Sequence, residues 1–386
     1  MEWIEKNAIE LYECSSGLSK AADQFGFGYP FLSYSDIFHN YYVPEKLLTL
    51  VNSTEKERKS CSVKRGDVFL TRTSETTDEL GMSCVALQDY PNATFNGFAK
   101  RLRPITNEIV PEYASYFFRS SYFRAQCMSL ASLITRASLN EGMIGRLKIR
   151  YPKSKDAQAK IGSILKNYDN LIENNNKRIK ILEQMAESLY KEWFVRFRFP
   201  GHETTPIKNG IPKGWKIEKI KNCVKRLPFG KTYKEAELEK EGSVIVIDQS
   251  TEPFIGYHDD VAAHQASANN PIILFGDHSC KFVLMTRNFS LGENIVPFVS
   301  YNDEIVNPYY LFFATHKIIE TTEYKRHWGE FVNKKILIPS IDLQKEFARM
   351  SIPLKLQLEQ LLIENQNLIK QRDLLLPRLM SGKLAV

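Results

Sequence analysis

Apolar residues recur at helical spacing along two long stretches of the chain. Between Leu165 and Trp193 they follow one another in alternating steps of three and four residues, with Lys, Arg and Glu between them. A similar series runs from Leu358 to Leu379. This spacing is typical of a coiled-coil seam, because a helix buried on all sides would be apolar all round. The pattern predicts two long helices that pair through one apolar face.

Each predicted seam contains one asparagine, at a corresponding place. A polar seam residue costs stability and is tolerated where it fixes register, so Asn175 and Asn365 either face each other or one water, or sit at a frayed seam edge. We expect Pro353 to interrupt the start of the second helix and Pro377 to close it. The predicted seam positions are Leu165, Ile172, Asn175, Ile179, Leu182, Leu189, Leu358, Leu362, Asn365, Ile369, Leu376 and Leu379.

The chain repeats one order of segments in its two halves. A short apolar run ending at Pro152 or Pro339 leads through Gln158 or Gln344 into each long helix. Such a repeat predicts an α+β fold of two mixed α/β globular domains separated by two long antiparallel coiled-coil helices, related by a pseudo-twofold internal repeat. The predicted boundaries are a first globular domain at 1–152, a helix at 153–198, a linker at 199–214, a second globular domain at 215–339 and a second helix at 340–386.

Composition places this chain among globular proteins. Of its 386 residues 43% are hydrophobic and 25% charged, no apolar run is long enough to cross a membrane, and no signal peptide is recognisable, so we expect a cytoplasmic protein without membrane contact. The six cysteines are isolated in sequence, which indicates reduced packing residues. An excess of 52 Lys and Arg over 45 Asp and Glu favours an acidic partner such as nucleic acid.

Catalytic and metal signatures are missing from the sequence. G-x-S-x-G, H-E-x-x-H and a nuclease centre are absent, so we expect no catalytic residue. His258, His264, Asp277, His278 and Cys280 lie close together in sequence, but their spacing matches no standard zinc site. Polar groove contacts or satisfied core histidines explain them better than a metal, and we expect no metal site.

Basic and polar residues interleaved with aromatic ones form several clusters in both halves. Arg and Lys suit phosphates and guanine edges, Gln suits adenine, and hydroxyl groups suit either. A single cluster of this kind is more often a solvated surface, but its presence in both halves favours DNA binding. The candidate DNA-binding residues are Lys20, Arg72, Thr73, Ser74, Lys100, Arg101, Arg103, Arg119, Arg124, Arg136, Ser138, Arg226, Lys231, Gln249, His278, Lys325, Arg326 and His327.

Over its whole length the chain resembles the DNA-specificity (S) subunits of type I restriction-modification enzymes. The helical regions resemble that family at 174–179, 189–195 and 372–382, and the first globular domain at 17–20, 66–74 and 98–103. The second domain carries Phe275-Gly276-Asp277-His278. Here the halves diverge, because Gly66-Asp67 opens a predicted strand and Gly276-Asp277 follows one. The two target-recognition domains are therefore expected to read different sequences.

The resemblance implies a non-catalytic subunit within a larger restriction system. It implies double-stranded DNA, two methyltransferase (M) subunits and restriction/translocase (R) subunits as partners. S-adenosylmethionine, ATP and magnesium would belong to those partners, with adenine-N6 methylation and ATP-dependent cleavage, and no cofactor to this chain. The resemblance assigns no base contact to any residue.

Two other classes of protein stay open at this point. One is a DNA-binding adaptor or regulator with two reading domains on a helical spacer and no methyltransferase partner. The other is an enzyme with an unrecognised site around His258 to Cys280.

Overall fold

The computed structural model describes residues 1–386 except 75–78, 131–136, 321–322, 324 and 385. It divides into two compact units: unit 1 comprises Met1–Asn174 with Asn365–Val386, and unit 2 comprises Asn175–Glu364. Each unit therefore holds one globular domain and part of both long helices. No described helix is long and apolar enough to span a membrane.

Unit 1 is built on two small sheets. The larger has the strand order β2-β9-β5-β7, and the smaller has β4-β3-β8, with β3 and β8 parallel. Their strands are β2 (Tyr12–Ser16), β3 (Phe25–Leu32), β4 (Thr49–Val51), β5 (Val68–Thr71), β7 (Ser83–Val85), β8 (Thr94–Phe95) and β9 (Ala99–Pro104). Two further pairs are β1 (Trp3–Asn7) with β11 (Lys148–Pro152) and β6 (Thr73–Ser74) with β10 (Ala137–Ser138). The short helices are α1 (Ala8–Leu11), α2 (Tyr34–His39), α3 (Glu55–Ser60), α4 (Pro111–Phe117), α5 (Ser121–Leu130) and α6 (Glu141–Arg146).

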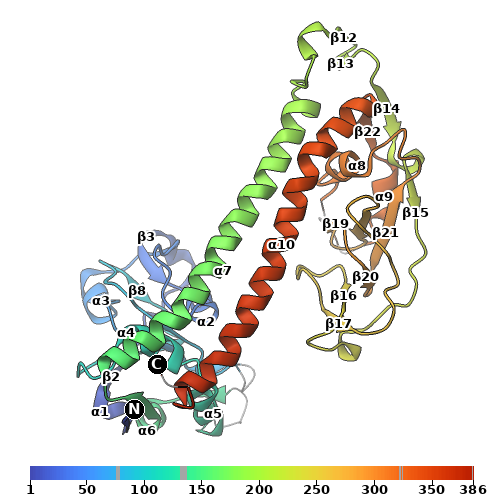
Figure 1. Ribbon diagram of the computed structural model, residues 1–386. Helices are drawn as coiled ribbons and strands as arrows, with labels where there is room; N and C mark the ends of the chain where they lie inside the picture. The colour runs from blue at the N-terminus through green and yellow to red at the C-terminus, as the bar shows by residue number, and fades with distance from the viewer. Residues whose placement is uncertain (75–78, 131–136, 321–322, 324, 385) are drawn as a thin grey trace. The chain divides into compact units, whose positions relative to one another are not determined.

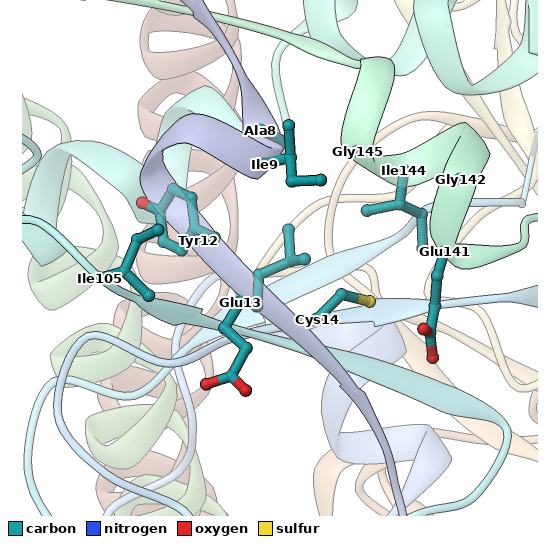
Figure 2. Close-up of a pocket in the computed structure, with 11 residues that line it drawn as sticks. Ala8, Ile9, Tyr12, Glu13, Cys14, Ile105, Glu141, Gly142, Ile144 and Gly145 are labelled. Atoms are coloured by element: carbon teal, nitrogen blue, oxygen red, sulfur yellow. The ribbon is translucent and has the colours of Figure 1, made fainter.

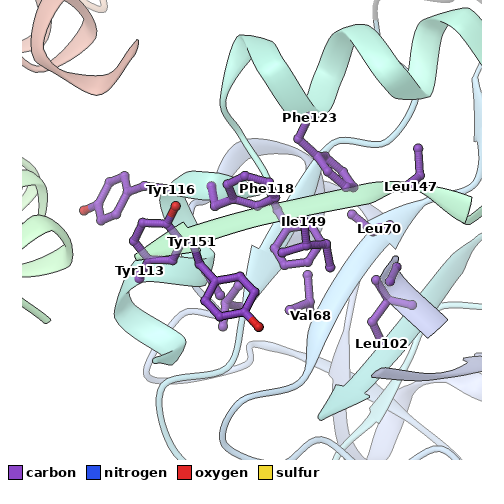
Figure 3. Close-up of a cluster of buried hydrophobic side chains, with 14 of the residues drawn as sticks. Val68, Leu70, Leu102, Tyr113, Tyr116, Phe118, Phe123, Leu147, Ile149 and Tyr151 are labelled. Atoms are coloured by element: carbon purple, nitrogen blue, oxygen red, sulfur yellow. The ribbon is translucent and has the colours of Figure 1, made fainter. Parts of the chain in front are cut away.

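One hydrophobic core of unit 1 lies between the larger sheet, β11 and the helices. Figure 3 shows Val68 and Leu70 of β5 close to Ile149 of β11, with the rings of Phe118 and Phe123 beside them. All five side chains are fully buried. The alternation of β5 explains the second core of the unit, since Phe69 points to the other face and packs there with Phe95.

Unit 2 repeats this architecture. Its larger sheet has the order β15-β21-β18-β19 and its smaller sheet β17-β16-β20, with β16 and β20 parallel. The strands are β15 (Val224–Arg226), β16 (Val244–Ile247), β17 (Gly256–His258), β18 (Ile272–Gly276), β19 (Phe282–Met285), β20 (Phe289–Leu291) and β21 (Ile295–Ser300). The pair β14 (Lys216–Lys219) with β22 (Lys335–Ile338) matches β1 with β11, and the short helices are α8 (Pro308–Thr315) and α9 (Trp328–Asn333).

The predicted repeat extends to single hydrogen bonds. In unit 1 the buried Gln158 side chain accepts from Val110 N at 2.8 Å and donates to Glu108 O at 2.9 Å and Pro152 O at 2.8 Å. In unit 2 Gln344 accepts from Asn307 N at 2.8 Å and donates to the carbonyls of Ile305 and Pro339. Each glutamine joins a strand, a helix start and a long helix. The internal repeat predicted from the sequence is therefore confirmed.

The two long helices are α7 (Lys155–Tyr190), which continues into a π-helical turn at Lys191–Val195, and α10 (Ile341–Met380) (Figure 1). In unit 1 Asp169 of α7 pairs with Arg372 of α10 at 2.6 Å. In unit 2 Tyr190 and Phe194 pack on Phe347 near the start of α10. Because the start of α7 meets the end of α10 and the reverse, the helices run antiparallel, as predicted.

Burial supports most predicted seam positions. Leu165, Asn175, Leu182, Asn365, Leu376 and Leu379 are buried, and Ile172, Ile179, Leu189, Leu358 and Leu362 are partly buried. Ile369 was predicted wrongly: it is 40% exposed, and Leu361, at 3%, was missed. The buried face of α10 steps from Asn365 to Leu368, because the helical repeat of 3.6 residues drifts from the assumed spacing.

Two expectations about chain breaks were wrong. Pro353 and Pro377 lie inside α10, which continues through both. Their side chains are exposed, so water can bond the carbonyls that each proline leaves without a donor. The linker also contains a hairpin of β12 (Ile207–Lys208) and β13 (Ile211–Pro212). Asn209 and Gly210 between them have φ of 56° and 78°, the left-handed pair that a two-residue hairpin turn requires.

Candidate nucleic-acid interface

In unit 1 the end of the central strand β5 meets a segment distant in sequence. Arg72 follows β5, its N–H donates to Phe98 O at 3.1 Å, and its carbonyl accepts from Leu139 N at 2.8 Å. The next residues, Thr73 and Ser74, pair as β6 with β10. The backbone thus brings two of the predicted DNA-binding clusters together, although Arg136 lies outside the described residues.

Unit 2 has the same arrangement at the end of β18. Asp277 N donates to Asn294 O at 2.8 Å, and Asp277 O accepts from His327 N at 2.8 Å. Gln249 joins this loop, since its Oε1 accepts from His278 N at 3.0 Å. Four predicted site residues, Gln249, His278, Arg326 and His327, therefore belong to one neighbourhood.

Residues that make the same backbone hydrogen bonds in the two units have different side chains. Arg72 in unit 1 corresponds to Asp277 in unit 2, and Ser138, which precedes Leu139, corresponds to Arg326, which precedes His327. A cation thus follows the central strand in one unit and an acid in the other. The expectation that Gly66-Asp67 opens a strand and Gly276-Asp277 follows one is also confirmed.

Several predicted DNA-binding cations of unit 1 bond to protein partners. Arg103 binds Asp67 through Nε at 2.8 Å and Nη2 at 2.6 Å, and this hydrogen-bonded carboxylate raises the pKa of Arg103. Lys100 is buried and donates to Ser16 Oγ at 2.8 Å and Glu141 at 2.6 Å. These side chains stabilise the larger sheet and its neighbours, and DNA contacts by them stay predictions.

The guanidinium groups of Arg119 and Arg101 also bond within the protein. The guanidinium of Arg119 donates to the carbonyls of Ser83, Ile37, Phe38 and Asn40, and burial lowers its pKa to about 10. Arg101, also buried, donates to Ser60 O at 3.2 Å and Ser62 O at 2.8 Å. Arg124 donates to Leu80 O, and Lys20 pairs with Glu57 at 2.8 Å. Arg72 is partly buried and lies in the loop that follows β5.

The predicted cations of unit 2 are more exposed. Arg226 lies over the rings of Phe229 at 4.7 Å and Trp328 at 5.9 Å from the ring centroids. Lys231 pairs with Asp260 at 2.6 Å, and this hydrogen bond raises the pKa of Lys231. Lys325 pairs with Glu323 at 3.1 Å, while Arg326 is 78% exposed. His327 is buried and interacts with Glu323 O at 3.2 Å, so it supports the loop from inside.

A groove of about 330 Å³ in unit 2 contains two of these cations. It is lined among others by Arg226, Phe229, Thr232, Asp277, Asn294 and Arg326. Sequence reasoning missed Phe229 and Asn294. The segment Gly292-Glu293-Asn294 between two apolar runs is the sequence signal of a tight turn, and it could have pointed to Asn294. In the structure Asn294 has a φ of 56°.

The hollow of unit 1 shown in Figure 2 has different chemistry. Its volume is about 500 Å³, and Ala8, Ile9, Tyr12, Ile105 and Ile144 make it largely apolar. Burial raises the pKa of the Cys14 thiol there to about 11, so the thiol is protonated at neutral pH and is not an activated nucleophile. No basic side chain lines this hollow, which makes it unsuited to DNA.

The histidines of unit 2 include core residues. His258 is buried, bonds Ser290 Oγ at 2.8 Å and stacks on Tyr233. His264 contacts Phe229 O at 3.1 Å, and burial lowers its pKa. Among the described residues no group of three or more His, Cys, Asp or Glu side chains could hold a metal ion.

Comparison with known proteins agrees with this architecture. Residues 9–184 match the family model "Type I restriction modification DNA specificity domain". The chain is 26% identical to the type I restriction enzyme MjaIX specificity subunit of Methanocaldococcus jannaschii, over 100% of this chain and 94% of that protein. It is 24% identical to the putative MjaX specificity subunit of the same organism, over 74% of this chain and 71% of that protein.

A solved structure has the same fold. The type I restriction-modification S subunit from M. genitalium superposes with a TM-score of 0.62 at 13% identity, covering 98% of this chain and 96% of that one. These similarities support the role of a DNA specificity subunit. They give no support to the alternative of a DNA-binding adaptor or regulator without a methyltransferase partner. Residues 9–184 therefore match the type I restriction-modification DNA specificity domain, and the chain as a whole is similar to the specificity subunits of type I restriction enzymes.

Proposed function

We propose that this chain reads a bipartite double-stranded DNA site, one half with each globular domain, and positions partner subunits on it. The observation that carries the proposal is the hydrogen-bond equivalence of the two loop edges together with their different side chains. Arg72 and Asp277 occupy the same backbone position, so the two units place opposite charges at equivalent points of one fold. Two readers of one architecture and different chemistry suit two different half-sites.

The proposed partners are two methyltransferase subunits and restriction/translocase subunits. S-adenosylmethionine, ATP and magnesium would act in those subunits, and this chain would contribute specificity without catalysis. The similarity to type I specificity subunits supports this division of labour. Co-purification of the chain with a methyltransferase subunit is the expected result. A chain that binds its site and recruits no methyltransferase would contradict the scaffolding role.

Domain exchange tests the reading role. Residues 1–152 are replaced by the corresponding segment of another family member, and methylated adenines are mapped in cells that express the hybrid. One half of the methylated motif should change and the other half should stay. A change in both halves, or in neither, would contradict the division between two readers.

A charge change provides a finer version of this test. Arg72→Glu should weaken binding to the half-site read by unit 1, by ~1–3 kcal/mol if Arg72 makes a base contact. The preference at the other half-site should stay unchanged. Total affinity should also fall steeply with salt, because Lys and Arg contacts release counterions. A flat salt response would exclude phosphate contacts.

A further inference from the structure

The groove of unit 2 combines acids and bases on one small surface. Arg226 and Arg326 line it together with Asp277, Glu293 and Asn294. A carboxylate repels a phosphate, so this mixture is unsuited to the DNA backbone. Base edges in the major groove present both hydrogen-bond donors and acceptors, and a mixed lining suits them.

The Asp277 carboxylate is held in place by the backbone. Its Oδ1 accepts from Trp328 N at 2.9 Å, at the first residue of α9. Its Oδ2 lies 3.9 Å from Arg326 Nε. The contact is on the Nε side of the guanidinium, so the edge formed by the two terminal nitrogens is left for another partner.

Arg326 has the exposure that a reading residue needs. Its side chain is 78% exposed, whereas that of Asp277 is 14% exposed. Arg226, which is also exposed, lies over the rings of Phe229 and Trp328, so its guanidinium plane already has aromatic partners. The groove thus has one arginine that lies over aromatic rings and one arginine whose Nε lies 3.9 Å from a carboxylate oxygen.

We propose that Arg326 reads a guanine of the half-site bound by unit 2, by donating from its terminal nitrogens to O6 and N7, and that Asp277 is its positioning residue. This inference rests on the proposed function and names the base contact within it. Arg is the side chain whose two parallel donors match the guanine edge. The corresponding residue of unit 1 is Ser138, so that unit does not share this contact.

The test uses the full chain co-expressed and purified with its methyltransferase subunits. Each guanine of the half-site read by unit 2 is replaced in turn by 7-deazaguanine, which lacks the N7 acceptor, and the Kd for each duplex is measured. One replacement should weaken wild-type binding by roughly tenfold, within the range of a lost base contact. The Arg326→Gln variant should bind the unmodified duplex about as weakly as the wild type binds that modified duplex. The 7-deazaguanine at this position should then cause no further loss of affinity in the variant.

Two variants separate reading from positioning and from bulk charge. Asp277→Asn should weaken binding less than Arg326→Gln and keep the sensitivity to 7-deazaguanine. Arg349→Gln removes an exposed arginine of α10 in the same unit and should keep both the affinity for the half-site and the sensitivity. Unchanged preference at the other half-site would show that Arg326→Gln is folded.

The inference is overturned if Arg326→Gln keeps the wild-type sensitivity at every guanine, or if the half-site of unit 2 contains no guanine. Failure of the proposed function is a different result. In that case the wild-type complex would bind all duplexes equally, and neither half-site would be detectable.

Discussion

Single buried amides connect strands and helices in both units. Gln158 and Gln344 are fully buried, and each makes three hydrogen bonds to backbone groups. Removal of such a side chain leaves buried N–H and carbonyl groups without a partner, which costs more than the bond itself contributes. These two residues therefore matter for the stability of their units.

Gln158→Ala should lower the free energy of unfolding by about 3 kcal/mol, and Gln344→Ala by a similar amount. Urea denaturation followed by circular dichroism measures the change. Gln184→Ala, at an exposed position of α7, is the matched control and should have almost no effect. Equal effects in all three variants would contradict a role for the buried amide.

Glu57 gives unit 1 a dependence on acid pH. The hydrogen bond from Lys20, followed by the backbone N–H of Thr54, lowers the pKa of this carboxyl from 4.5 to about 2. A carboxyl whose pKa is lowered on folding contributes stability above its unfolded pKa, and that contribution disappears as pH falls through the folded value.

The stability difference between wild type and Glu57→Gln should therefore be largest near neutral pH and shrink as pH falls from 4.5 towards 2. Denaturation curves at several pH values test this. Glu55→Gln, in the same helix α3 and with a more exposed ion pair, is the control. A difference that stays constant over this range would contradict the assignment.

At the scale of elements, the long helices contain polar residues inside largely apolar faces. Asn175 is 4% exposed and occupies a predicted seam position. Asn175→Leu should raise the Tm while loosening register, because leucine removes the cost of a buried amide together with its specificity. Asn174→Leu, at the exposed neighbouring position, should leave the Tm nearly unchanged. Unchanged melting and unchanged DNA binding in Asn175→Leu would argue against a seam position.

The ion pair between α7 and α10 in unit 1 gives a second test. The side chains of Asp169 and Arg372 are 11% and 14% exposed, and Asp169 also accepts a hydrogen bond from Tyr116. Arg372→Leu should destabilise the protein by about 3 kcal/mol, because it leaves a largely buried carboxylate without its cation. Asp169→Leu combined with Arg372→Leu should recover much of the loss. Additive losses in a double-mutant cycle would rule out a coupled pair.

At the scale of the whole molecule, the two readers share two continuous helices. α7 has 36 residues and α10 has 40, and both contribute to each unit. Helices of this length extend for roughly 55 Å and are stiff, so we expect them to fix the separation between the half-sites.

The length of the unread gap in the DNA should therefore be critical. Adding or removing one base pair rotates one half-site by ~35° relative to the other and should abolish specific binding. Electrophoretic mobility shifts on a series of gap lengths measure this, with each half-site kept intact. Equal binding over several gap lengths would show that the connection between the readers is flexible.

Features that depend on neighbours in sequence were predicted well. The spacing of apolar residues predicted α7 and α10, and the repeated Gln158 and Gln344 predicted two related units. The Asn209-Gly210 hairpin depends equally on local backbone preference and was overlooked. Ile369 was misplaced because a regular heptad was assumed where the helix drifts.

The sequence alone determined the two long helices, the repeat and the clusters of basic residues, because each follows from local spacing and composition. Only the tertiary structure decided which cations are paired within the protein and which are exposed. Arg103 meets Asp67 and Lys100 meets Glu141 across strands and loops that are distant in the chain, whereas Arg326 stays exposed. The partner of a charged side chain cannot be predicted from local sequence, because the two residues come close only when the chain folds.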